Sequence, residues 1–388
     1  MCEGARERSA CSSEIKSERD DELLLHMRQK LACAKYGNAP ARYWHLNALP
    51  VSCEVSRGRS NAARRTSFQV KITGNKRDEF WPPLPFAEWK ETAETLHMWT
   101  QIIGKIRLTQ TPWINHSWHV TLYLTARGLT TSSIPYGLYI FEIRFDFIDH
   151  ELRIAKSDGA MRILKLRPQS VAKFYQEVMK TLAELDLPVT INTTPNEIQD
   201  AIPFERDETH RSYDRDYANR FWRVLLQTDR VFKDFRSRFC GKCSPVHFFW
   251  GSFDLAATRF SGRPAPPHPG GVPHLPDAIA REAYSQEVSS LGFWPGNAAA
   301  PTPIFYSYAY PEPPGFADAK IQPEAASYQP GLREFILPYD AVRTGESPDE
   351  VLLDFAQSTY DAASKLASWD RNALEEVKPS LHSPRPHS

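Results

Sequence analysis

The chain has 388 residues, enough for two domains or one large one, and 41% of them are hydrophobic. Lys and Arg together number 47, as do Asp and Glu, so the overall charge shows no bias toward nucleic acid, an anionic membrane or an acidic substrate. No apolar run approaches the ~20 residues of a membrane span and no secretory signal is evident, so we expect a soluble, cytoplasmic protein.

Residues 1–78 differ in composition from the rest of the chain. They mix charged clusters with few aromatic residues, show weak periodicity and carry four of the six cysteines. Such a composition favours a disordered or dispensable N-terminal extension over a basic arm for nucleic acid. No nucleic-acid partner is expected.

Residues 79–187 are predicted to form a first α+β half. Pro85 suits the first turn of a helix, and apolar residues then recur at helical spacing as far as Ile106. Alternating apolar and polar residues predict strands over 119–127 and 141–148, and a Ser-Asp-Gly turn at 157–159 joins two shorter strands. Ser170 is expected to cap a closing helix.

Residues 188–372 are predicted to form a second half with the same order of elements. We expect a short strand over 189–193, a long helix from Asp214, and strands over 246–260, 304–310 and 334–337. Pro/Gly-rich insertions occupy 262–277 and 295–303, with a short helix over 278–290 between them. The residues from Ser347 to Glu350 form a capping-box pattern for a last helix, and 373–388 read as a disordered tail.

Two stretches, at 103–131 and 240–263, suggest that the halves are related. Each follows a helix, begins with Gly-Lys and places a Trp nine positions before an Arg, as Trp118 and Arg127 and as Trp250 and Arg259. The sequence therefore predicts an α+β fold, because strands come in runs rather than alternating with helices. It consists of two similar helix–antiparallel sheet–helix halves, and a pseudo-duplication is one interpretation of their likeness.

Several long stretches carry a family resemblance. They include WPPLP, NHSWHVTLYLTARGLTT and GKCSPVHFFWGSFDLAATRFSGR, and they fall between Trp81 and about Trp369. The chain resembles an uncharacterised bacterial family that is known only as a domain of unknown function. The resemblance implies no activity, cofactor or catalytic residue.

The motifs of common enzyme families are missing from the sequence. It has no Walker A loop, no G-x-G-x-x-G, no H-E-x-x-H and no G-x-S-x-G. Cys240 and Cys243 form a C-x-x-C that follows a helix, so we expect ordinary thiols. His116 and His119 form an H-x-x-H that would point to opposite faces of a strand, and no metal site is predicted.

The richest polar set lies in the predicted strand over 246–260. On a regular strand Trp250 and Asp254 share one face with Ser252 and Thr258, whereas His247 and Arg259 lie on the other. An acid inside an apolar run is costly unless it is paired, so Asp254 belongs either to a structural pair or to a binding cleft in which Arg127 or Arg259 holds an anion. Ser252 as a nucleophile is the weaker interpretation.

A stripe of tyrosines recurs at every second position of a predicted strand, at Tyr306, Tyr308 and Tyr310. These side chains either belong to the core or form a platform on which a flat ligand stacks. We therefore expect a small molecule to bind in a polar and aromatic cleft between the two halves. The alternative is a non-catalytic interaction module, and whether the protein is an enzyme, its cofactor and its oligomeric state stay open. The ligand-binding candidates are Asp254, Arg259, His247, Trp250, His119, Arg127 and Tyr308.

Overall fold

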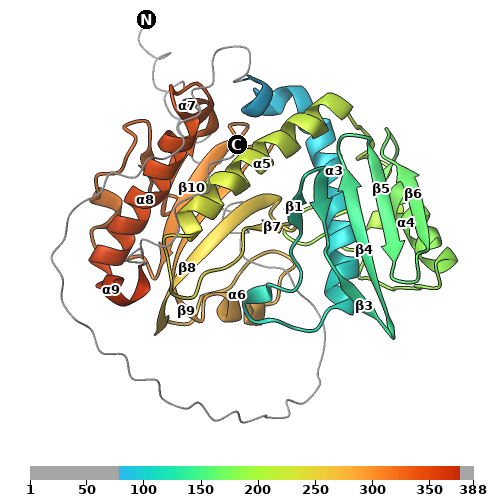
Figure 1. Ribbon diagram of the computed structural model, residues 1–388, viewed down its shortest axis with the longest axis horizontal. Coiled ribbons are helices and arrows are strands. Elements are labelled where there is room, and N and C mark those ends of the chain that lie inside the picture. Colours follow the sequence, from blue (N-terminus) through green and yellow to red (C-terminus); the bar gives the residue numbers. More distant parts are fainter. Residues whose placement is uncertain (1–77, 376–388) are drawn as a thin grey trace, which may run out of the picture.

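The computed structural model describes residues 78–375, and Figure 1 shows them as two sheets with helices packed against them. The predicted extension at 1–78 and the predicted tail at 373–388 lie outside these residues except at their inner ends. There the prediction of a disordered tail does not hold for 373–375, because a short helix ends at Leu374 and Glu375 pairs with Phe239. Within the described part of the chain, no helix is long and apolar enough to cross a membrane.

The first sheet has six antiparallel strands, and its main path runs β1-β2-β4-β5-β6, with β3 paired to β4. The strands are β1 (Tyr123–Thr125), β2 (Gly128–Thr130), β3 (Ile134–Tyr136), β4 (Tyr139–Asp146), β5 (Glu151–Lys156) and β6 (Met161–Lys165). Its apolar face packs against α3 (Phe86–Gln110) and α4 (Val171–Glu184). The alternation in β4, with Phe141, Ile143 and Phe145 buried, sets which face is covered.

The second sheet also has six strands, in the order β11-β12-β10-β9-β8-β7, all antiparallel to their neighbours. The strands are β7 (His247–Phe249), β8 (Asp254–Pro264), β9 (Gln286–Trp294), β10 (Ile304–Tyr310), β11 (Ser327–Gln329) and β12 (Glu334–Pro338). Helices α5 (Arg215–Arg236) and α8 (Pro348–Leu366) cover one of its faces.

Short helices complete the structure. Near the other face of the second sheet, η1 (Asn115–Ser117) packs against α6 (Asp277–Ala283). The remaining short helices are η2 (Phe204–Arg206), η3 (Phe316–Asp318), α7 (Tyr339–Arg343) and α9 (Arg371–Leu374).

The edges of the two sheets meet at β1 and β7. Leu122 and Phe248 exchange both backbone hydrogen bonds, each at 2.9 Å, so the two sheets are joined at this point. One apolar cluster contains buried residues of both halves, among them Trp99 and Phe145 from the first half and Phe248 and Phe335 from the second. The molecule therefore shares one main core.

Many of the expected elements are confirmed. β4 and β10 lie where alternation placed them, and β5 and β6 flank the expected Ser-Asp-Gly turn. Ser170 accepts a hydrogen bond from Lys173 as the α4 cap, and Asp214 caps α5. The last helix begins at Pro348 as expected, but the Ser347 side chain makes no capping hydrogen bond, so the capping box itself does not form. The α+β class is therefore confirmed.

Three local predictions were wrong in their element or its bounds. Residues 189–193 form a loop, and the strand expected over 119–127 is reduced to β1, with Arg127 in the turn that follows. The helix expected over 278–290 ends at Ala283, and β9 begins at Gln286. Both faces of β9 are largely buried, so its sequence lacks the alternation that reveals a half-exposed strand.

The strand expected over 246–260 is a hairpin. β7 ends at Phe249, and the chain reverses through residues 250–253, where Phe253 has a left-handed backbone with φ 60°. This reversal changes which side chains share a face. Trp118 ends η1 and Trp250 lies in the hairpin turn, so the two tryptophans are not in equivalent strands and the duplication is not confirmed.

Candidate functional site

Asp254 begins β8 and lies on the face of the second sheet that carries the tyrosine stripe. It is fully buried, with 0% of its surface exposed, and the Tyr306 hydroxyl donates a hydrogen bond to its Oδ2 atom. The sequence predicts that Asp254 must be paired, which is confirmed, and the partner is a tyrosine of the stripe. Because burial and the nearby Asp254 charge raise the pKa of Tyr306 well above its usual value, Tyr306 keeps its proton and stays a donor.

Gly292 makes the contact between Tyr306 and Asp254 possible. It lies in β9 between Ala256 of β8 and Tyr306 of β10, and the Tyr306 ring crosses it. A Cβ atom at Gly292 would lie 2.2 Å from the Tyr306 hydroxyl oxygen. Any side chain at this position would therefore displace the ring from the Asp254 carboxylate.

Glu197 is a second buried acid, in the loop between α4 and α5. Only 2% of its surface is exposed, and its backbone is left-handed with φ 63°, a conformation that is uncommon for residues other than Gly. Neither carboxylate oxygen makes a hydrogen bond of ordinary geometry with the described residues, although the Ser252 hydroxyl is close enough to lower the pKa. Burial first, and then the Asp254 charge, raise the pKa of Glu197 well above 4.5.

His97 adds a neutral imidazole from α3. Its Nε2 atom lies 2.8 Å from the carbonyl oxygen of Gly251 and therefore carries the proton. The side chain of Gln101 is oriented by the Asn196 backbone, donating to its carbonyl at 2.9 Å and accepting from its N–H at 2.8 Å. Burial lowers the pKa of His97 to about 4, so the ring is uncharged at neutral pH.

Glu197 and His97 line a cavity of about 530 Å³, which we call the Glu197 pocket. Its walls come from α3, the loop at 197–200, the β7–β8 turn and the segment after β9, so both halves of the chain contribute. His210 and Glu94 also line it, and the hydrogen bond from His210 to Asp207 at 2.7 Å raises the pKa of this imidazole. The other polar lining residues are Gln199, Asp200, Ser252 and Asn297.

The pocket can hold and move a proton. Two buried carboxyl groups that interact cannot both ionise cheaply, and Tyr306 already donates to Asp254. Burial and the Asp254 charge therefore favour the protonated form of Glu197. The Glu197 carboxyl group, the uncharged His97 imidazole and the Ser252 hydroxyl together provide hydrogen-bond donors and acceptors on this part of the pocket wall.

The seven residues singled out from the sequence lie in several places. Asp254, Tyr308 and His247 share one face of the second sheet, because His247 pairs directly with Ala256 across the hairpin. The expectation that His247 lies opposite Asp254 was wrong, since it assumed one continuous strand. The pKa of His247 falls to about 3, chiefly by burial, and Tyr308 accepts a hydrogen bond from Tyr284 at 3.2 Å.

Trp250 and Arg259 make contacts within the fold that are sufficient to explain their burial. The Trp250 indole donates to the Val120 carbonyl at 2.7 Å and packs against Gly104 of α3. Arg259 lies on the opposite face of the sheet, where its guanidinium stacks 3.4 Å from the Phe235 ring centre and 4.3 Å from that of Tyr360. Burial lowers the pKa of Arg259 to about 10.

The two first-half residues lie away from the Glu197 pocket lining. His119 is buried, and its Nδ1 atom accepts a hydrogen bond from the Ile114 N–H at 3.2 Å. Arg127 is half exposed and forms ion pairs with Asp146 at 2.5 Å and with Asp149 at 2.6 Å. Of the seven, Asp254 is the one whose charge acts directly on Glu197.

The cysteine and histidine pairs have separate environments. Cys240 and Cys243 are free thiols, and burial raises the pKa of Cys243. His116 binds the Ala283 carbonyl through Nδ1 at 3.0 Å and accepts from Lys242 through Nε2 at 2.6 Å. Among residues 78–375 no group of three or more potential metal ligands comes together.

Sequence reasoning missed Glu197 and His97. Glu197 lies in a stretch that was expected to be a connection, and nothing in Pro-Asn-Glu marks a buried acid. A signal did exist in α3, where the polar residues His97, Gln101 and Lys105 recur every four positions among the apolar residues of the second half of the helix. That spacing places them on one face, which is the face that contacts the loop at 194–197.

The fold and the site define a mixed α+β protein in which a buried acid, Glu197, lines a cavity between the two halves and interacts with a second buried acid, Asp254. Residues 81–376 match the model of DUF5996, described as a family of unknown function, and the chain belongs to this family. No curated protein and no solved structure matches the chain.

Proposed function

We propose that the protein binds a small, uncharged, polar molecule in the Glu197 pocket and is an enzyme that uses Glu197 as a proton donor. The observation that supports this most directly is a carboxyl group that is almost fully buried, lines a cavity of about 530 Å³ and has its pKa raised well above 4.5. Titratable groups with shifted pKa values in a cavity are typical of catalytic sites.

Asp254 is a positioning residue in this proposal. Its charge raises the pKa of Glu197, and Tyr306 keeps the Asp254 carboxylate oriented. When Glu197 donates its proton, the pair becomes doubly charged, so the proton returns readily. Neutral His97 lines the same cavity and can accept a hydrogen bond or a proton from the ligand through the nitrogen that does not bind Gly251.

The left-handed backbone at Glu197 and at Phe253 supports the same proposal. Both residues line the pocket, and neither is a glycine. Strained backbone of this kind costs on the order of 1–3 kcal/mol and tends to be retained where a functional geometry requires it.

The test is a screen of small uncharged metabolites by thermal shift, followed by titration calorimetry of the hits on three chains. We expect the wild type to bind, and Ala299→Trp, which fills the pocket from the segment after β9, to lose binding by more than about tenfold. Ala278→Trp is the matched control, because Ala278 is an exposed alanine of α6 that does not line the pocket.

Glu197→Gln separates binding from proton transfer. Glutamine keeps the shape and a donor group but cannot give up a proton, so it should bind a hit with similar affinity and fail to convert it. Hits that bind Ala299→Trp as tightly as wild type would contradict the proposed site. Hits that Glu197→Gln converts at the wild-type rate would contradict the proposed role of the acid.

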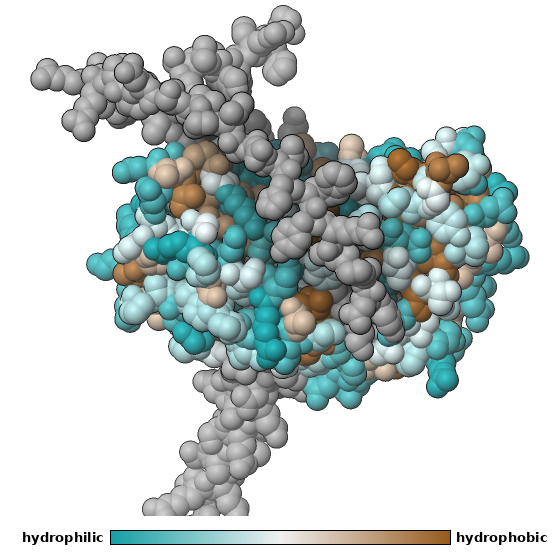
Figure 2. All heavy atoms as spheres, turned by 90° about the horizontal axis from the view of Figure 1, so that it is seen from below, coloured by the Kyte–Doolittle hydropathy of each residue, from teal (hydrophilic) through white to brown (hydrophobic). Residues whose placement is uncertain are grey.

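A second candidate function, binding of a protein partner, is favoured by the outer face of the first sheet. Leu138 is fully exposed, and Ile140, Met161 and Ile163 are each more than two-fifths exposed on β4 and β6 or in the loop before β4. Figure 2 shows brown, hydrophobic surface at the end of the molecule where the first sheet lies. Sedimentation of wild type and of Ile163→Asp tests association through this face. A charge at position 163 should abolish any association that the wild type shows.

A further inference from the structure

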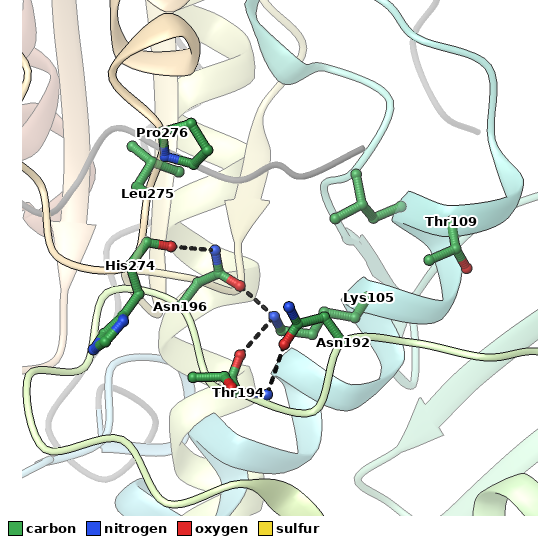
Figure 3. A pocket seen from close by; sticks show the side chains of 9 residues that line it. Lys105, Thr109, Asn192, Thr194, Asn196, His274, Leu275 and Pro276 are labelled. Atoms are coloured by element: carbon green, nitrogen blue, oxygen red, sulfur yellow. Dashed lines mark hydrogen bonds between the residues drawn. The ribbon is translucent and has the colours of Figure 1, made fainter. Parts of the chain in front are cut away.

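A second cavity, of about 550 Å³, lies on the other side of the loop at 192–200 from the Glu197 pocket. We call it the Lys105 pocket. Figure 3 shows Lys105, Asn192, Thr194 and Asn196 gathered in its centre, with Thr109 on one side and Leu275 and Pro276 on the other. Thr109 and Lys105 come from α3, whereas Leu275 and Pro276 come from the Pro-rich segment before α6.

We propose that the Lys105 pocket is a second binding site and that it takes the phosphate or carboxylate group of a small metabolite. This proposal does not require that Glu197 act as a proton donor. The argument rests on the charge, the donors and the shape of the cavity wall.

The charge at the wall is positive. Lys105 is only 4% exposed, and lysines are rarely buried to this extent. None of the described residues that line the cavity carries a carboxylate. The Lys105 ammonium binds the Thr194 carbonyl at 2.8 Å and the Asn196 side chain, and its donors can rotate toward a ligand.

The wall also offers uncharged donors. The Asn192 Oδ1 atom accepts a hydrogen bond from the Thr194 N–H at 2.9 Å, which orients the Asn192 amide group so that its NH₂ is the end left for a ligand. The Thr109 hydroxyl lies on the same cavity. An ammonium, an amide NH₂ and a hydroxyl around one cavity form a donor set that suits an oxyanion.

The loop couples the two pockets. Asn196 holds Lys105 through its side chain and Gln101 through its backbone, and the next residue is Glu197. An anion that draws Lys105 away from Asn196 would release one of the contacts that fix the loop. Occupancy of one pocket should therefore change affinity in the other, and by linkage the effect is mutual.

The test is thermal unfolding of the full chain in inorganic phosphate or acetate at constant ionic strength. Wild type should show a saturable rise in Tm, because an anion that binds only the folded state stabilises it by mass action. Lys105→Met keeps a long unbranched side chain. It should raise the anion concentration needed for half of the Tm increase by about tenfold or more.

Asn192→Asp is a second variant that does not rely on a change inside α3. Aspartate can still accept from the Thr194 N–H, but it places a negative charge on the cavity wall and should weaken the response to a similar extent. Asn297→Asp is the matched control, because Asn297 accepts from the Ala300 N–H at 2.7 Å in the same way but lines the Glu197 pocket.

A saturable response that Asn192→Asp loses and Asn297→Asp keeps supports the site, even where Lys105→Met fails to fold. Saturation with phosphate alone assigns a phosphoryl group, and saturation with acetate assigns a carboxylate. A rise that never saturates, or one that is equal in wild type and Asn192→Asp, overturns the proposal.

Discussion

At the scale of single residues, the central feature is the interaction of two buried acids. Asp254 could be anticipated, because an acid inside a run of Phe, Leu and Ala must find a partner. Glu197 could not, because the side chains that bury it come from α3 and from the β7–β8 turn, far away in sequence. The sequence identified one member of the pair, and only the fold brings in the other.

The raised pKa of Glu197 predicts a pH-dependent stability. A carboxyl whose pKa is higher in the folded state stabilises the fold at low pH, and this contribution is lost as pH rises from about 4.5 through the folded-state pKa. Glu197→Gln removes the titration. As pH rises across that window, the free energy of unfolding of the variant should increase relative to that of wild type by up to about 1.4 kcal/mol per pH unit.

Urea unfolding at several pH values measures this difference. Glu208→Gln, an exposed position in the same loop, is the control and should follow wild type at every pH. Parallel pH profiles for wild type and Glu197→Gln would show that Glu197 does not titrate differently in the folded state.

The Tyr306–Asp254 hydrogen bond gives a second prediction. Tyr306→Phe keeps the ring that crosses Gly292 and removes the donor to a buried carboxylate, so it should cost about 1–3 kcal/mol. Asp254→Asn should in addition flatten the pH dependence due to Glu197, because it removes the charge that raises the Glu197 pKa. A Tyr306→Phe variant as stable as wild type would mean that the hydrogen bond contributes nothing.

At the scale of elements, prediction succeeded where one face is exposed and failed where both are buried. β4 alternates clearly because the outer face of the first sheet meets solvent, and the hairpin of β5 and β6 is marked by its Ser-Asp-Gly turn. β7, the first part of β8 and most of β9 are covered on both sides, so apolar residues do not alternate with exposed polar ones there, and β9 buries serines as well as apolar residues. A turn inside such a stretch, at residues 250–253, leaves no periodic signal.

The packing of α3 against that turn gives the third prediction. A Cβ atom at Gly104 would lie 2.1 Å from the Trp250 indole nitrogen, so Gly104→Ala should destabilise by more than about 3 kcal/mol despite the better helix propensity of Ala. In the double variant Gly104→Ala/Trp250→Ala, the smaller side chain at 250 should accommodate the new methyl group. The double variant should therefore lose less unfolding free energy than the sum of the losses of the two single variants. Additive losses in chemical denaturation would show that the two residues do not contact.

At the scale of the whole molecule, the order of helices and strands suggests two halves, and the contacts tie them together. The indole of Trp222 on α5 donates to the Thr125 carbonyl of the first sheet at 3.2 Å, and Asn219 donates to Phe147 at 2.9 Å. The same helix packs against β8 of the second sheet. Both candidate pockets also draw walls from each half, so a ligand in either would add to this connection.

We therefore expect the two halves to unfold as one unit. The shared apolar core and the Leu122–Phe248 backbone pair leave no boundary at which one half could separate without exposing apolar surface of the other. Backbone circular dichroism and tryptophan fluorescence should give coincident transitions.

Phe248→Ala, at the junction of the two sheets, should lower the free energy of unfolding measured by both signals by about 3–5 kcal/mol. Ile163→Thr, at the exposed edge strand β6, should change the free energy of unfolding little. Hydrogen exchange should then show β5 and β9 opening at the same denaturant concentration. If β9 stays protected after β5 has opened, the halves are separate domains and the division near residue 188 is a true domain boundary.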